Sequence, residues 1–134
     1  MDLDQVLILA PEGAARTGLE EVFFRLGRRV VARDPEGAAE APAEGDVIIL
    51  DLRECDVDLR HLARALRADA RPLMVVAEQP SPLLIELQNR PGGLALLTGA
   101  ESDAGYRVAL RVCEALSARE LIRAGTAEAL PLAG

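Results

Sequence analysis

The chain has 134 residues, half of them hydrophobic, which is enough for one domain with its own core and no disulfide framework. Its 22 acidic and 15 basic residues give a formal charge of −7, which argues against direct binding of nucleic acid through a basic surface. All 15 basic residues are arginine, and the absence of lysine excludes Schiff-base catalysis, a lysine general base and a Walker-type phosphate loop.

The apolar residues follow two periodicities that alternate along the chain. Short continuous runs are typical of strands buried on both faces, and apolar residues at every third or fourth position are typical of helices with one buried stripe. Because strands that alternate with helices imply right-handed crossovers, we predict an α/β fold, a three-layer α/β/α sandwich around a five-stranded parallel sheet. In chain order the expected elements are a strand at 6–9, a helix at 15–26, a weaker strand at 29–32, a short helical turn at 36–40, a loop at 42–45, a strand at 47–50, a helix at 59–66, a strand at 73–76, a weaker helix at 83–87, a strand at 94–97 and a helix at 109–116.

The C-terminal part differs in composition from the rest. Residues 118–134 are alanine-rich, so we predict a domain over 1–117 followed by a connector, with one more helical turn before a frayed end. The first residues carry acids where a secretory leader needs positive charge, and no apolar run approaches the roughly 18 residues of a membrane span. The two cysteines, Cys55 and Cys113, have no CxxC partner. We therefore expect a cytoplasmic chain without a membrane segment.

Ligands of open parallel sheets bind beyond the carboxyl ends of the strands. Asp51 directly follows the buried run 47–50 and is therefore expected to point into that crevice. This strand, the order of the elements and the glycine-led run Gly92-Gly93-Leu94-Ala95-Leu96-Leu97 resemble the receiver domain of two-component response regulators, over about residues 4–117. The resemblance implies a flavodoxin-like (CheY-like) fold and magnesium-assisted transfer of a phosphoryl group from a histidine kinase to Asp51.

In that family the reaction also uses two acids after the first strand, a hydroxyl after the fourth and a lysine after the fifth. Because phosphoryl transfer depends on positioning and charge, the loss of these groups predicts an atypical receiver that is not switched by aspartyl phosphorylation. Magnesium binding by Asp51 and Glu12 is expected to be weak or absent, and no metal or cofactor is predicted. The family's positions carry other residue types here: Ala10 and Pro11, with Glu12 following, then Ala77 and Thr98.

Several side chains also have simpler structural interpretations. Asp51 either hydrogen-bonds loop amides or contacts a ligand, and Glu12 is either a helix-start carboxylate or a lone metal ligand. His61 and Cys55 are too few ligands for a metal site, and Cys113 is expected in the core. Four arginines on the third expected helix form either a solvated face or a docking surface for an acidic partner: Arg60, Arg64, Arg67 and Arg71.

These observations together predict a non-enzymatic regulatory domain that controls an output, such as transcription, through protein contacts or a small-molecule ligand. A homodimer is expected, because receivers pair through their last helices and Val108, Leu110 and Val112 cannot all point inward. The resemblance also implies a DNA-binding effector domain beyond the C-terminus, with 118–134 as its connector. Two alternatives stay open: a small enzyme with Asp51 and Glu12 as an acid/base pair, and a purely structural docking module.

Overall fold

The sheet has five parallel strands in the order β2-β1-β3-β4-β5, as the computed structural model shows. The structure describes residues 3–36, 38–55 and 58–133, with side chains described as far as 119. The flavodoxin-like α/β fold and all five predicted strands are confirmed. The elements of the described residues are β1 (Gln5–Leu9), α1 (Ala14–Arg25), β2 (Arg29–Arg33), β3 (Val47–Asp51), α2 (Arg60–Ala68), β4 (Leu73–Val76), α3 (Pro82–Leu87), β5 (Leu94–Leu97) and α4 (Asp103–Ala133).

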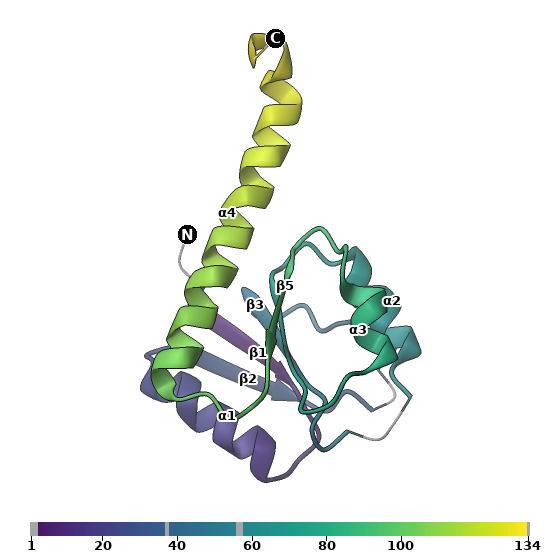
Figure 1. The fold of residues 1–134 in the computed structure, drawn as a ribbon, viewed down its shortest axis with the longest axis vertical. Coiled ribbons are helices and arrows are strands. Elements are labelled where there is room, and N and C mark those ends of the chain that lie inside the picture. Colours follow the sequence, from purple (N-terminus) through teal and green to yellow (C-terminus); the bar gives the residue numbers. More distant parts are fainter. Residues whose placement is uncertain (1–2, 37, 56–57, 134) are drawn as a thin grey trace.

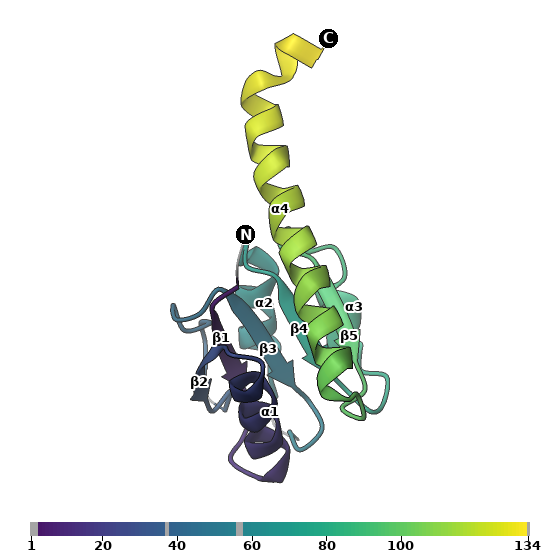
Figure 2. The same cartoon turned by 90° about the vertical axis from the view of Figure 1, so that its left-hand side faces the viewer.

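Helices cover both faces of the sheet, with α1 and α4 on one side and α2 and α3 on the other (Figures 1 and 2). Successive strand residues point to opposite faces, so Ile8 packs on the α1/α4 side and Leu7 on the α2/α3 side. Phe23 of α1 meets Tyr106 of α4 edge to face, with ring centroids 5.6 Å apart. Cys113 is fully buried in this layer, as predicted, and burial raises its pKa to about 12.

The segment between β2 and β3 forms no helix in its described residues, so the helical turn predicted at 36–40 is wrong. Ala38 N donates to Pro35 O in a single turn, and Gly37 lies outside the described residues. Ala38 and Ala41 pack against the α2/α3 side of the core. The sequence explains the difference, because proline and glycine disfavour a helix here and alanines offer little apolar area to bury.

Helix α4 is much longer than the predicted 109–116 with one further turn. It continues without a break across residue 117 and projects beyond the sheet (Figures 1 and 2). Helix-forming alanine, arginine, glutamate and leucine predominate in 118–130, so local propensity continues after the amphipathic pattern ends. No helix in the described part of the chain is long and apolar enough to cross a membrane.

Arg90 fastens the edge of the sheet where β4 and β5 begin. Its side chain is buried, and burial lowers its pKa. Gly92 passes so close to the carbonyls of Ala70 and Arg71 that a Cβ atom would collide with them. This close approach explains the glycine before β5. The Arg90 guanidinium donates to four backbone carbonyls, those of Leu66, Asp69, Arg71 and Gly93.

Candidate functional site

The crevice at the carboxyl ends of the strands contains Asp51, the last residue of β3, which is 1% exposed. Both of its carboxylate oxygens accept hydrogen bonds from Arg53. The backbone N and Nε of Arg53 each lie 3.0 Å from Oδ1, and Nη2 lies 2.8 Å from Oδ2. The hydrogen bond to Asp51 is the main cause that raises the pKa of Arg53. The predicted loop-amide bond to Asp51 is present, with a guanidinium added to it.

Arg53 also connects Asp51 to the loop after β5. Its Nη1 lies 3.4 Å from the carbonyl oxygen of Gly99. Gly99 has a φ of +94°, and a Cβ atom there would collide with the Arg53 guanidinium. Glycine therefore serves two needs at this position, the left-handed backbone and the close approach of a cation.

Thr98, at the family's lysine position, contacts Glu101 of the same loop. Glu101 Oε2 accepts from Thr98 N at 3.0 Å and from Thr98 Oγ1 at 2.9 Å, and Oε1 accepts from Gly99 N at 2.8 Å. Burial opposes the ionised form of Glu101, but these hydrogen bonds outweigh it and lower the pKa of Glu101. The cation of this crevice therefore comes from Arg53 instead of from the position after β5.

The residues at the family's acid-pair positions lie apart from Asp51 in their contacts. Ala10 is buried, and its N donates to Arg33 O at 3.1 Å. The side chain of Glu12 is 88% exposed, and its Oε1 lies 3.9 Å from Nη2 of Arg16. Asp51 and Glu12 thus belong to separate ion pairs. Among the described residues, no group of three or more His, Cys, Asp or Glu side chains is placed to hold a metal ion.

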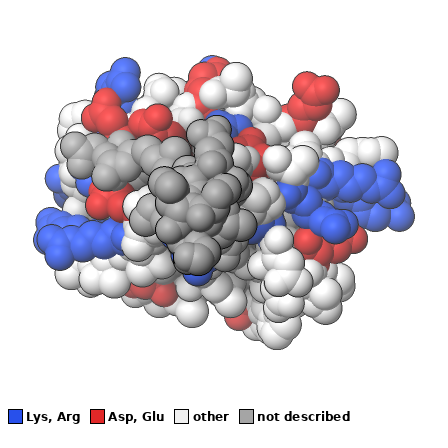
Figure 3. All heavy atoms as spheres, turned by 90° about the horizontal axis from the view of Figure 1, so that it is seen from above, with Lys and Arg blue, Asp and Glu red and all other residues white. Residues whose placement is uncertain are grey.

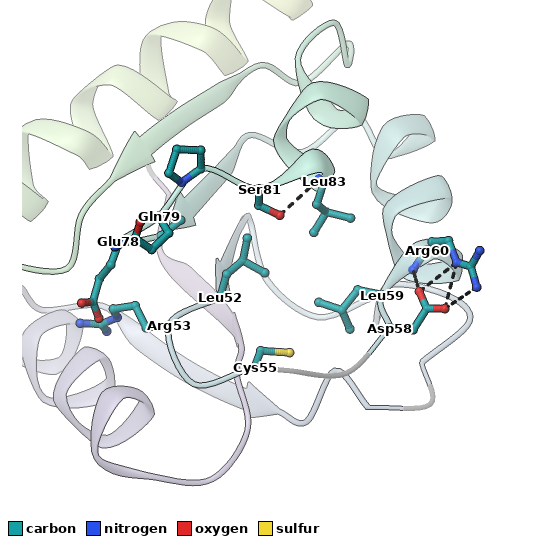
Figure 4. A pocket seen from close by; sticks show the side chains of 12 residues that line it. Leu52, Arg53, Cys55, Asp58, Leu59, Arg60, Glu78, Gln79, Ser81 and Leu83 are labelled. Atoms are coloured by element: carbon teal, nitrogen blue, oxygen red, sulfur yellow. Dashed lines mark hydrogen bonds and ion pairs between the residues drawn. The ribbon is translucent and has the colours of Figure 1, made fainter.

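A groove with a volume of about 430 Å³ lies between the loops that follow β3 and β4 (Figure 4). Leu52, Leu59 and Leu83 give it apolar walls, and Arg53 and Glu78 lie together at one end. Ala77, at the family's hydroxyl position, also lines this groove. Thr98 instead lines a second hollow of about 360 Å³, to which Arg53 and Glu78 also belong. Arg53 therefore stands between the two predicted positions.

The predicted arginine stripe does not lie on one helix, because α2 ends at Ala68 and Arg71 follows that end. Asp69, whose backbone is extended, stops the helix there. Arg71 pairs with Asp69 and donates to the carbonyls of the 42–45 loop. Arg60 pairs with Asp58. Only Arg64 and Arg67 of the four form no ion pair within the described residues.

Sequence reasoning missed Arg53, although the chain carries a signal for it. The spacing Asp-x-Arg occurs three times, and each time the arginine folds back onto the aspartate two residues before it. The recurrence of this spacing, with one copy at the end of a buried strand, indicates the pair. The three copies are Asp51-Leu52-Arg53, Asp58-Leu59-Arg60 and Asp69-Ala70-Arg71.

No family model and no curated protein sequence matches this chain. Among solved structures, the Vibrio cholerae chemotaxis protein CheY4, crystallised at low pH, is similar with a TM-score of 0.64 and 18% identity, covering 84% of this chain and 99% of that one. A yeast Spc42 trimeric coiled-coil segment, amino acids 181–211, fused to another protein gives a TM-score of 0.61 at 16% identity, covering 99% of this chain and 95% of that one. At these identities the comparisons show a CheY-like fold.

Proposed function

We propose that this chain is an atypical receiver that controls an output, such as transcription, in the cytoplasm without conventional aspartyl phosphorylation. The observation that carries the proposal is the ion pair between Asp51 and Arg53. The carboxylate that would attack phosphorus is 1% exposed, and both of its oxygens are bound by a guanidinium. A nucleophile held in this way is neither free nor accessible.

The neighbouring loops support the same conclusion. In the family a hydroxyl and a lysine contact the phosphoryl oxygens, and those positions carry Ala77 and Thr98 here. Arg53 instead joins Asp51 directly to the Gly99 carbonyl. Because this link between β3 and the loop after β5 is built from the chain's own groups, it needs no phosphate to form.

Phosphorylation chemistry tests the proposal directly. We expect that incubating the full chain with acetyl phosphate and magnesium produces no gain of one phosphoryl group by intact mass. A receiver that carries the acid pair, hydroxyl and lysine, treated in the same tube, serves as the positive control. A phosphoryl group found on Asp51 by peptide mapping would overturn the proposal, and unmodified Asp51 beside a labelled control would support it.

The proposed role is regulatory instead of catalytic. The separate ion pairs of Asp51 and Glu12 support this, since an acid/base pair needs both carboxylates near one substrate. We propose that the signal arrives through protein contacts or a small molecule, for which the groove beside Arg53 is one place. A thermal-shift screen against metabolites separates these inputs, because a specific stabilisation indicates a ligand and its absence favours a docking module.

We also propose a homodimer that uses the outer face of α4. Val108 and Val112 are 60% and 43% exposed, one turn apart, whereas Leu110 is buried. Exposed aliphatic side chains one turn apart favour packing against a second copy of the chain. We propose that the projecting half of α4 leads to an effector domain. Sedimentation at micromolar concentration tests the dimer, and a monomer there would contradict it.

A further inference from the structure

Eight of the fourteen arginines whose side chains the structure describes form ion pairs with carboxylates, and two of the remaining arginines lie on α2. Arg25 and Arg29, for example, pair with Asp103 and Asp4. Arg64 and Arg67 of α2 are exposed and form no ion pair within the part of the chain that the structure describes. They lie three residues apart, so the two charges share one face of the helix and repel each other. An external carboxylate would relieve that repulsion.

A hollow of about 290 Å³ lies between α2 and α3. Arg67 and the buried Arg90 line it, and every hydrogen bond of the Arg90 side chain goes to a backbone carbonyl. The opposing charge in the lining is Glu86 of α3. Figure 3, which keeps the left and right of Figure 1, shows basic side chains gathered at the edge where α2 and α3 lie. The hollow therefore carries net positive charge.

An apolar side chain lies at the same place. Ile85 of α3 lines the hollow with Arg67 and is 72% exposed. Beside arginines, an exposed isoleucine offers an apolar anchor next to charges that select the partner, which is how protein interfaces are built. A nucleic acid would use the arginines without using Ile85, so the apolar side chain favours a protein partner over a nucleic acid.

From this arrangement we infer that Arg64, Arg67 and Ile85 form a docking surface for an acidic segment of a partner protein, which places an apolar side chain against Ile85. This surface uses only two of the four arginines of the predicted stripe. Arg60 and Arg71 are neutralised by Asp58 and Asp69 and do not contribute. It makes no use of Asp51, so it stands or falls independently of the proposed function.

A titration of the full ¹⁵N-labelled chain tests this surface. The probe is a short synthetic peptide of glutamate and leucine, with the leucines at helical spacing. We expect amide shifts confined to α2 and α3 and a dissociation constant that rises about tenfold in the double variant Arg64→Gln/Arg67→Gln, as for the loss of two exposed ion pairs. Ile85→Ser is expected to weaken binding as well, and added salt to weaken it further.

The matched control removes two exposed arginines from a different helix. Arg107→Gln/Arg111→Gln on α4 changes the net charge by the same amount and is expected to leave the affinity unchanged. An equal loss in both double variants, or shifts elsewhere, would show attraction to charge alone and overturn the inference. So would a single-stranded oligonucleotide that binds this surface more tightly than the peptide, because it would indicate a nucleic-acid partner.

Discussion

Two ion pairs of the same local form lie at opposite edges of the sheet. Asp51–Arg53 lies where β3 ends, and Asp69–Arg71 lies just before β4 begins. In both, the arginine donates its backbone N and Nε to Oδ1 and its Nη2 to Oδ2 of the aspartate. In both, the remaining donors reach a distant loop, at Gly99 in one case and at 42–45 in the other. The same Asp-x-Arg turn thus binds a distant loop both where β3 ends and where β4 begins.

What separates the two pairs is depth. The aspartate side chain of the first pair is 1% exposed, and that of the second is 17% exposed. A third copy, Asp58–Arg60, has an aspartate side chain that is 57% exposed. Water and salt screen charges more strongly at the surface. The contribution of the same hydrogen bonds to stability should therefore decrease from the first pair to the third. Position in the sheet, more than local geometry, decides what each pair contributes.

The largest effect is expected when Arg53 is replaced by alanine. In this variant, Asp51 stays charged at a position that is 1% exposed. Of the hydrogen bonds in this pair, only the one from the backbone N of residue 53 remains. Removing one partner of a buried ion pair costs about 3 to 5 kcal/mol. We therefore expect the free energy of unfolding, measured in urea by circular dichroism, to fall by about that amount.

A second variant separates the charge from the packing. Asp51→Asn/Arg53→Gln removes both charges and keeps a polar side chain at each position, so it should recover most of the loss of Arg53→Ala. If the double variant is as unstable as the single one, the uncompensated Asp51 charge is not the cause. The stability of the crevice would then depend on the contact of Arg53 with Gly99.

The parts of the fold that could be predicted from sequence are those with a single physical solution. A run such as 47–50 must be buried on both faces, so its place in the sheet follows from its composition. This signal is absent at 36–40, whose described residues form no helix, although Ala38 packs on the core. It is also absent beyond Leu116, where helix propensity continues without an apolar stripe. Local pattern alone does not decide such segments.

The candidate site was predictable only in part, for a related reason. The order of the strands identifies Asp51 as a crevice residue, and the structure buries it there. Its partner lies two residues away in the recurring Asp-x-Arg spacing, but the further contact of Arg53 with Gly99, 46 residues along the chain, has no local signal. A contact across that separation depends on the relative placement of β3 and β5, which is a property of the assembled sheet.

A smaller effect, and one that depends on pH, is expected at the second pair. Burial opposes the ionised form of Asp69, but hydrogen bonds from Arg71 outweigh it and lower the pKa of Asp69. Such a group stabilises the fold above the unfolded-state pKa of about 3.9 and loses that contribution as the pH falls through its folded-state value. Asp69→Asn should therefore cost about 1 kcal/mol at neutral pH.

The pH profile distinguishes this ion pair from simple packing. We expect the gap between wild type and Asp69→Asn to start closing below the unfolded-state pKa of about 3.9 and to close as the pH falls through the lower folded-state pKa, because Asp69 is then protonated and as uncharged as asparagine. Urea midpoints measured at neutral pH and through the acid range supply the comparison. A gap that stays constant with pH would mean that the asparagine perturbs the 42–45 loop by its shape, and that the charge of Asp69 contributes little.

The smallest effect is expected at the exposed copy, where Arg60→Ala should leave the urea midpoint unchanged within error. Arg60 Nη2 lies 2.6 Å from Asp58 Oδ2, so the geometry is as good as in the buried pairs, and the side chain of Arg60 is 78% exposed. Water competes for both charges there, and holding two long side chains together costs conformational entropy. Asp58→Ala should cost more than Arg60→Ala, because it also removes the hydrogen bond from the backbone N of residue 60 at the start of α2. A midpoint that drops as far in Arg60→Ala as in Arg53→Ala would show that hydrogen-bond geometry governs these pairs, and the distinction by depth would be wrong.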